Sequence, residues 1–572
     1  EGYGLNQEAV DLLCGAGVTL IITVDCGITA IAEAAYAKGL GADVIVTDHH
    51  ECKESLPAAV AVVDPHRPDC PYPFKALAGV GVALKLALAL TPEDQRPAVL
   101  GTYADLAAVG TVADVMTLTG ENRTLVQQGL HLLSRGGRPG MQALMRECGV
   151  DGKPLSADRV GFSLAPRINA AGRMGQAMLA AELLLTEDVP RAEELARALC
   201  QLNRERQCIE AEIFEECLSR LERDSVGPRR CIVLAGENWP QGVVGIVASR
   251  LAERFSCPTF MICLQDGRGK GSCRSFGGFN LFQALESCSD LLESFGGHAL
   301  AAGFSLLEGQ VDALRTRMEA CVEEWTGGAE LVSVLEIDAE LPNPELLTVD
   351  DILGLGLLEP YGAGNPKPVF CLSGCTIVTC THVGGGRHLK LKLSRCGRTL
   401  DAIFFSTTAA AVGVAIGERV DAVFTPQIND FRGTRTVQLL LCGLRPATTR
   451  MEAELALYER LRQGEPLSAE EAASLIPSRA EFAAVWRYLN GHARLGGVEE
   501  TARRLARCIA KTYNIKETVM RTMVCLEVLD EHGLIQMEQT TDHLRISVCE
   551  ATHRVDLETS VLMRRLRRLA GE

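Results

Sequence analysis

The sequence lacks several features that would define its class at once. Its 22 cysteines form no CxxC pair, which argues against zinc sites of the finger or ribbon type and favours reduced thiols. No apolar run is long enough to span a bilayer, and no basic segment followed by an apolar one opens the chain. We therefore expect a cytoplasmic protein with no membrane partner. The chain also has fewer basic than acidic residues. Its formal net charge of -16 argues against indiscriminate binding to polyanions.

The first part of the chain has the pattern of a parallel, doubly wound sheet. β-branched apolar segments at 18–25, 42–48 and 60–64 are separated by a short helical pattern. Ligands bind at the carboxyl ends of the strands in such sheets. Asp25 and Asp48 both fall at such ends, so the sequence predicts a polar site at this edge.

The remainder of the chain, which has 572 residues, is long enough for several further domains. A helical pattern over about 187–224 predicts a long connector, and a second α/β unit follows, with a glycine-rich segment at 267–278. Five short strands between 376 and 442 favour an OB-fold barrel, and residues 450–572 are helical with a wing-like hairpin near the end.

Asp48, His49 and His50 follow the second predicted strand directly. Mg2+ and Mn2+ prefer oxygen ligands, and Mn2+ also accepts imidazole. Asp25 comes from the neighbouring strand, and Asp114 ends the segment Gly110-Thr-Val-Ala-Asp. Any one of these aspartates alone is better explained as a helix cap. Their combination with a double histidine favours a divalent metal site.

Several segments resemble a known family. ITVDCG (22–27), VIVTDHH (44–50) and GTVAD (110–114) are similar to the second, third and fourth motifs of the DHH phosphoesterases. Five more segments narrow the resemblance to RecJ-type exonucleases, namely GYGLN (2–6), PRINAAGRM (166–174), FGGHALAAG (295–303), EPYGAGNPKPVF (359–370) and NDFRGTRTVQL (429–439). The resemblance covers residues 1 to about 445.

The resemblance implies an α/β protein with a defined domain order. We expect a parallel-sheet DHH catalytic domain at 1–180, a connecting helix at 181–228, a DHHA1-like substrate-binding domain at 229–330, a linker at 331–369, an OB-fold nucleic-acid-binding barrel at 370–448 and a mainly helical, winged-helix-like domain at 449–572.

The resemblance also implies an activity, namely 5'-to-3' exonuclease action on single-stranded DNA that releases mononucleotides in DNA repair and recombination. Asp25, His49 and Asp114 would bind a pair of Mn2+ or Mg2+ ions. Asp48 and His50 would ligate, orient or activate water nearby, so that Asp48, His49 and His50 are the expected catalytic residues. Single-strand-binding protein or other replication and repair proteins are candidate protein partners.

Phosphate binding is expected from three segments, whose residues are Arg167, Asn169, Arg173, Ser272, Arg274, Gly296, Gly297 and His298. The alternatives are solvated arginines at a helix entry, a simple hairpin at 267–278 and a core histidine. Local charge favours binding, because seven Lys or Arg face three Asp or Glu between 229 and 276, and nine face four between 377 and 445.

One feature of the family is absent. DHH enzymes carry a D-x-D-x-D-G motif whose aspartates help to hold the metals, and no such motif precedes Asp25. We expect it to lie upstream of Glu1, so the metal site would be incomplete and this fragment inactive alone. Two alternatives remain open, namely another DHH phosphodiesterase acting on oligonucleotides or cyclic dinucleotides, and a non-catalytic RecJ-like nucleic-acid-binding protein.

Overall fold

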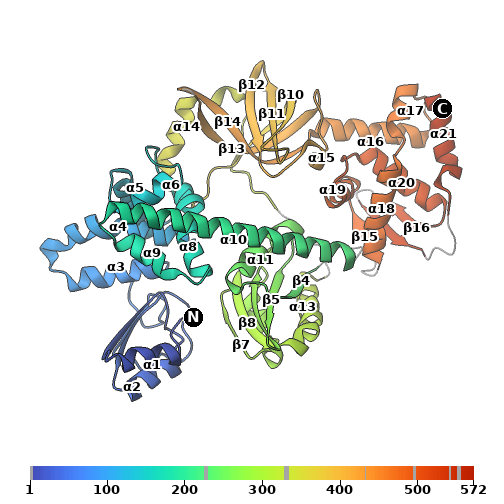
Figure 1. The fold of residues 1–572 in the computed structure, drawn as a ribbon. Helices are drawn as coiled ribbons and strands as arrows, with labels where there is room; N and C mark the ends of the chain where they lie inside the picture. The colour runs from blue at the N-terminus through green and yellow to red at the C-terminus, as the bar shows by residue number, and fades with distance from the viewer. Residues whose placement is uncertain are drawn as a thin grey trace. The chain divides into compact units, whose positions relative to one another are not determined.

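The computed structural model describes residues 4–224, 230–327, 334–431, 433–493, 497–539, 543–549 and 555–571. Gly2 and Tyr3 of the GYGLN segment and Arg432 of the NDFRGTRTVQL segment lie outside these ranges. The chain packs as two compact units, the first formed by 1–217, 231–321 and 356–367 and the second by 218–230, 322–355 and 368–572. Figure 1 shows the course of the chain.

The first unit begins with a small parallel sheet. Strands β1 (Leu20–Val24), β2 (Asp43–Thr47) and β3 (Ala61–Val63) pair in that order, with α1 (Gln7–Gly15) and α2 (Ile31–Gly39) packed against them (Figure 1). The continuous apolar pattern predicts burial on both faces of the sheet. The structure instead leaves Leu20, Ile22 and Val24 of β1 47 to 50% exposed, so the described residues cover only one face of this strand.

A helical body follows the sheet. It comprises α3 (Gly79–Leu90), α4 (Arg96–Ala113), α5 (Gly120–Ser134), α6 (Pro139–Glu147), α7 (Ala157–Arg159), α8 (Ala165–Arg173), α9 (Ala177–Leu185) and α10 (Val189–Asp224). Its core is aliphatic and includes Leu144, Leu164 and Leu183. The helix α10 has 36 residues and is therefore about 54 Å long, which fits a connecting element.

The second α/β region, which belongs to the first packing unit, is built on one mixed sheet. Strands β4 (Ile232–Glu237), β5 (Thr259–Gln265), β6 (Arg268–Arg274), β8 (Ala301–Leu307) and β7 (Ser294–Gly297) pair in this order, and only β4 and β5 are parallel. The helices are α11 (Gln241–Phe255), α12 (Leu281–Glu286) and α13 (Val311–Thr326). The glycine-rich segment predicted at 267–278 therefore contains a strand, which is the hairpin alternative.

The second packing unit contains a closed barrel. Strands β10 (Phe370–Val383), β11 (His388–Arg395), β12 (Arg398–Phe404), β13 (Arg419–Phe431) and β14 (Thr434–Pro446) surround a core that includes Leu391, Ala402 and Phe424. The β10–β11 pairing closes the barrel, and β12 pairs with β14 in parallel. This is the OB-fold topology. Near it lie β9 (Ala339–Glu340), α14 (Val349–Leu355) and α15 (Ala409–Val412).

The last domain is mainly helical. It contains α16 (Thr448–Gln463), α17 (Ala469–Leu475), α18 (Arg479–His492), β15 (Val498–Glu500), α19 (Ala502–Tyr513), α20 (Val519–Glu531), β16 (Ile535–Gln539), β17 (Leu544–Val548) and α21 (Val561–Ala570). The fold class expected from the sequence is thus confirmed. No helix within the described residues combines the length and the apolar character that a membrane crossing requires.

Candidate metal centre

Asp25 ends the first strand in an unusual conformation. Its amide still donates to the carbonyl oxygen of Thr47 (3.0 Å), so it continues the parallel ladder, but its φ is 63°. A left-handed conformation at a residue other than glycine is often found at functional sites. Gly79, the first residue of α3, lies against its side chain, because a Cβ there would come within 2.3 Å of Asp25 Oδ1. The left-handed backbone at Asp25 sets the direction of this carboxylate, and the missing side chain of Gly79 leaves space for it.

Asp48 is buried at the end of β2, with a side chain only 1% exposed. Its Oδ2 accepts from the amide of Ile28 (2.9 Å), and its Oδ1 accepts from the amide of His49 (2.8 Å) and from Nδ1–H of His50 (2.6 Å). Burial tends to raise the pKa of Asp48, but the hydrogen bonds from His50 and Ile28 outweigh it and lower that pKa. The ionised carboxylate thus fixes the turn that carries both histidines.

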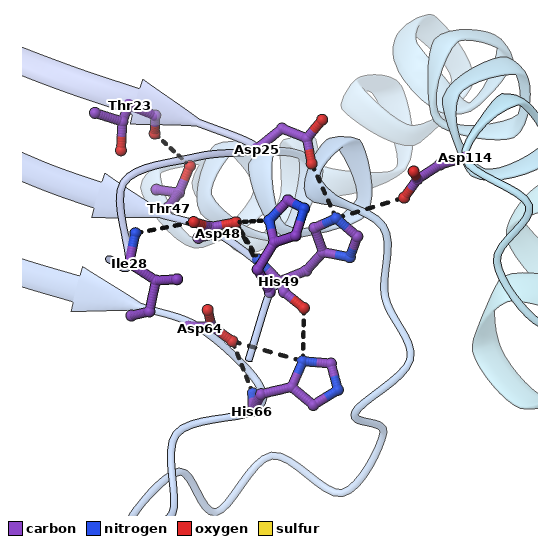
Figure 2. Close-up of polar contacts among 10 residues, drawn as sticks. Thr23, Asp25, Ile28, Thr47, Asp48, His49, Asp64, His66 and Asp114 are labelled. Atoms are coloured by element: carbon purple, nitrogen blue, oxygen red, sulfur yellow. Dashed lines mark hydrogen bonds and ion pairs between the residues drawn. The ribbon is translucent and has the colours of Figure 1, made fainter. Parts of the chain in front are cut away.

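His49 is the point at which two separate carboxylates meet. Its Nε2 lies 3.0 Å from Asp25 Oδ1 and 3.4 Å from Asp114 Oδ2, as Figure 2 shows. Burial opposes protonation of His49, yet Asp25 and Asp114 outweigh it and raise its pKa. Burial and the nearby Asp25 raise the pKa of Asp114. The raised pKa of His49 follows from the two carboxylates beside it, whereas the raised pKa of Asp114 follows first from burial.

Asp114 reaches the site from a helix rather than from a strand end. The segment Gly110-Thr-Val-Ala belongs to α4, and Asp114 is the C-cap residue of that helix. Asp105 also lies within α4, where it is 5% exposed and forms an ion pair with Arg138 (3.1 Å). Asp105 therefore has a structural partner away from the metal centre.

His50 and His298 connect this centre to the second α/β unit. Their rings stack with centroids 5.6 Å apart and an interplanar angle of 16°. The hydrogen bond with Asp48 raises the pKa of His50, whereas burial and the charge of His50 lower that of His298. The stacked rings place two imidazoles side by side, and an imidazole N–H can donate to a phosphate oxygen.

Sequence reasoning did not identify His66 or Asp64. Asp64 follows β3 and is 2% exposed, and its Oδ1 accepts from the amide of His66 (2.8 Å). The Nδ1–H of His66 donates to the carbonyl oxygen of His49 (2.6 Å), as Figure 2 shows. The rule that polar residues gather at strand ends, which pointed to Asp25 and Asp48, would also have pointed to Asp64. Gly79 carries no local signal.

The residues present fit a divalent cation. Asp25, His49 and His50 each offer one ligand atom within 4.8 Å of the others, and Asp114 adds a carboxylate on the His49 side. Two carboxylates that converge on one nitrogen leave negative charge for a cation to neutralise, and an oxygen and imidazole donor set suits Mn2+ or Mg2+.

A second cluster gathers positive charge. Arg173 donates to the carbonyl oxygen of Gly242 (2.7 Å), and Arg274 donates to Ser272 Oγ (3.0 Å). Burial lowers the pKa of Arg173, and the charges of Arg206 and Arg274 lower it further because these guanidinium groups lie nearby. Neighbouring arginines with nearby hydroxyl donors can bind phosphate.

The sheet register links this cluster to the glycine-rich turn of β7. Ser272 and Gly296 both pair with Gly303, from opposite sides of β8. Gly297 has φ 133°, and a Cβ there would lie 2.5 Å from Ala302 Cα, so only glycine fits. The amide of His298 donates to the carbonyl oxygen of Ala301 (2.8 Å), which fixes the turn.

The structure does not bring Arg167 into this cluster. Arg167 is half-buried on α8, donates to the carbonyl oxygen of Ser163 and lies beside Cys200. Asn169 is exposed on the same helix. A helix turns residues two positions apart to different faces, so Arg167 and Asn169 do not share one face of α8.

Comparison with protein families gives three matches along the chain. They are the DHH family, N-terminal domain, at residues 4–111, the DHHA1 domain at 229–324 and the RecJ OB domain at 337–443. These ranges contain the glycine-rich turn and most of the barrel. They also contain the residues of the candidate metal centre apart from Asp114. The fold and site thus define a protein of the DHH type.

Individual relatives narrow the class further. The chain is 40% identical over 444 residues to the single-stranded-DNA-specific exonuclease RecJ of Bacillus subtilis, covering 77% of this chain and 56% of the relative. It is 39% identical over 467 residues to RecJ of Dickeya dadantii, covering 78% and 81%. The chain belongs to the RecJ family, which confirms the resemblance found in the sequence.

Solved structures agree with this assignment. A crystal structure of Thermus thermophilus RecJ in complex with Mn2+ matches with a TM-score of 0.67 and 36% identity, over 77% of this chain and 63% of that one. A second Thermus thermophilus RecJ structure, in complex with Mg2+, matches with a TM-score of 0.60 and 32% identity, over 77% and 70%. The chain therefore spans less than two thirds of two of these relatives.

Proposed function

We propose that the protein is a metal-dependent exonuclease that degrades single-stranded DNA from the 5' end to mononucleotides, in DNA repair and recombination. The observation that carries the proposal is the convergence of Asp25 and Asp114 on His49 Nε2, at 3.0 and 3.4 Å. Membership in a family whose relatives are named single-stranded-DNA-specific exonucleases supports it.

In this proposal Asp25, His49 and Asp114 hold the divalent cations, either Mn2+ or Mg2+. Bound cations of this kind lower the pKa of a ligated water and stabilise the charge of a phosphodiester undergoing attack. Asp48 acts by orientation, since both its oxygens already accept hydrogen bonds from the turn. In this proposal the Nδ1–H of His50 donates to Asp48, and the raised pKa that follows favours the cationic ring, whose charge attracts a phosphate.

The substrate side of the proposed site comprises Arg173, Ser272 and Arg274 together with Gly296, Gly297 and His298. The close guanidinium groups neutralise phosphate, and the glycine turn lets a polynucleotide backbone approach closely. Arg167 and Asn169 of α8 are further proposed phosphate contacts. Single-strand-binding protein or other replication and repair proteins are the proposed protein partners.

Two measurements test this function. The chain is assayed, alone and together with whatever residues its gene encodes before Glu1, on single strands labelled at the 5' or the 3' end. We expect labelled mononucleotide to appear first from the 5' label, to require Mn2+ or Mg2+ and to disappear in Asp48→Ala.

Calorimetric titration of Mn2+ into the wild type and Asp25→Asn supplies a readout that does not depend on catalysis, with weaker binding expected in the variant. Release from the 3' label, equal digestion of duplex, or Mn2+ binding unchanged by Asp25→Asn would contradict the proposal. Binding of single strands without cleavage, in every form of the protein, would favour a non-catalytic role.

A further inference from the structure

The last domain has the element order of a winged helix. In sequence, α18, β15, α19, α20, β16 and β17 follow one another, and the three strands pair in the order β15-β17-β16. In helix-turn-helix proteins the second helix of the motif enters the major groove, and here that helix is α20. The three matched family domains end at residue 443, so this domain lies beyond them.

The structure excludes α20 from that role. Eight of its 13 residues are buried. Its polar side chains are also occupied by neighbouring helices. Glu527 accepts from Tyr458 Oη of α16 (2.6 Å), Arg521 donates to the carbonyl oxygen of Ser474 in α17 (2.8 Å), and Glu531 accepts from Ser560 Oγ, which caps α21 (2.6 Å). A groove-reading helix needs a free face, and α20 has none.

The preceding helix α19 has the opposite character. Its sequence ARRLARCIAKTY contains three Arg and one Lys but no acidic residue. Leu505, Ala506, Ile509 and Ala510 are buried against the domain, whereas all four basic side chains are exposed. Arg503, Arg507 and Lys511 are spaced four residues apart, so they form a straight row about 12 Å long.

Two of the four basic residues have acidic neighbours and two do not. Arg504 pairs with Glu500 (3.1 Å), and Arg507 lies 3.6 Å from Glu517. Within the part of the chain that the structure describes, no ion pair or hydrogen bond is found for the side chains of Arg503 and Lys511. Their charge is therefore available to a ligand.

The position of α19 beside the OB-fold barrel is fixed. The turn between α19 and α20 packs on the barrel, because a Cβ at Gly413 would lie 2.9 Å from the amide of Glu517, and Lys516 pairs with Glu418 (2.9 Å). Figure 1 shows α19 next to α15 of the barrel. The row of cations thus lies beside a fold that commonly binds single strands.

We propose that α19 is a second nucleic-acid-binding element, which binds the phosphodiester backbone through Arg503, Arg507 and Lys511 without reading bases. An acidic protein surface is less suitable, because α19 exposes no large hydrophobic side chain and protein interfaces need apolar anchors. Contacts to phosphate alone position a protein without conferring sequence specificity. The identity of the polynucleotide as DNA rests on the proposed function, whereas the site itself does not require cleavage.

The test measures binding by the full chain in the presence of a chelator, so that no cleavage occurs. Fluorescence anisotropy with labelled single-stranded and duplex oligonucleotides gives Kd as a function of salt for the wild type and for Arg503→Gln/Lys511→Gln. Each lost phosphate contact reduces the slope of log affinity against log salt by about 0.7 for a single strand and about 0.9 for duplex DNA. Two lost contacts therefore predict a reduction of about 1.4 with the single strand and about 1.8 with the duplex.

A matched control removes the same charge elsewhere. Arg565 and Arg568 are exposed on α21, and Arg565→Gln/Arg568→Gln should leave the slope unchanged. The conservative pair Arg503→Lys/Lys511→Arg should retain the wild-type slope. An unchanged slope in Arg503→Gln/Lys511→Gln, or an equal reduction in the α21 control, would overturn the proposal. If the nuclease assay fails while the α19 variant still reduces the slope, the proposed function falls and this site remains.

Discussion

Two clusters of charged residues in this protein differ in a way that separates a site from a structural junction. In the metal centre, Asp25 and Asp114 both point at His49, so two acids share one weakly basic partner. Between the barrel and the last domain, acids and bases alternate. There Arg450 pairs with Glu418 (3.2 Å) and Glu454 (2.9 Å), and Lys516 pairs with Glu418 (2.9 Å).

The two clusters differ in whether their own charges balance, and this difference indicates which of them binds a ligand. At the junction the charges are balanced within the chain, because two basic side chains pair with two carboxylates. The metal centre is not balanced, because burial and Asp25 raise the pKa of Asp114 while the two carboxylates raise that of His49. Such imbalance costs stability and is maintained where a ligand supplies the missing charge.

Removal of the shared imidazole should have the largest effect. His49→Ala takes away the one group that both carboxylates approach, and we expect Mn2+ affinity to fall by more than about 100-fold, since even residues that only orient ligands cost about 10- to 100-fold. Calorimetric titration measures the change. His131→Ala, at an exposed position on α5, serves as control. Equal affinities in the two variants would mean that His49 is no ligand.

Breaking the balanced junction should reduce stability rather than binding. Arg450→Met removes the ion-pair partner of Glu454, which is 10% exposed, and one of the two partners of Glu418, which is 18% exposed. The expected loss in the free energy of unfolding is about 3 kcal/mol, measured by urea denaturation. Arg545→Gln removes an exposed pair with Glu499 and should cost at most about 1 kcal/mol. If both variants lost the same small amount, the junction would not be a stabilising network.

A smaller effect is expected from a residue that shapes the metal centre without touching metal. Gly79→Ala places a Cβ 2.3 Å from Asp25 Oδ1 and should displace that carboxylate, which reduces Mn2+ affinity about tenfold. Gly101→Ala, in α4 with no atom within 4 Å of the added Cβ, should bind Mn2+ normally and gain up to about 1 kcal/mol of stability. Normal Mn2+ binding by Gly79→Ala would show that Asp25 needs no such support.

The smallest effect concerns pH in a balanced pair. Arg460 and the amide of Ser468 lower the pKa of Glu471 to about 2, from 4.5. A lowered carboxyl pKa stabilises the fold above pH 4.5, and this stabilisation is lost as the pH falls toward 2. The difference in Tm between the wild type and Glu471→Gln should therefore shrink over this window. A difference that stays constant with pH would contradict this assignment.

The sequence predicted that the polar residues of the candidate metal centre would lie together, because parallel strands bring their carboxyl ends together. Asp25 and the Asp48-His49-His50 turn follow from that rule alone, and Asp114 was added as a third acid at the end of the segment Gly110-Thr-Val-Ala-Asp. The sequence did not reveal that Asp114 caps a helix, since an apolar segment such as Gly110-Thr-Val-Ala suits either a strand or a helix. Gly79 could not be found either, because its role is a contact with a residue 54 positions away.

The glycine-rich strand β6 shows a second limit. The sequence left phosphate binding and a simple hairpin open for this segment, and Gly269 and Gly271 lie within a strand, where a Cβ would meet Ile262 at 2.7 Å and Phe304 at 2.1 Å. They are small because large neighbours occupy the same face. Local sequence cannot distinguish a glycine needed for a turn from one needed for packing. The same reason hid the burial of α20, whose covering helices lie far away in sequence.

Anomalous diffraction from crystals soaked in Mn2+ tests the central claim most directly. The account predicts a manganese peak about 2.0–2.6 Å from His49 Nε2 and from carboxylate oxygens of both Asp25 and Asp114. A peak that contacts none of these three side chains, or no peak in a crystal whose Asp25, His49 and Asp114 are accessible to solvent, would contradict it.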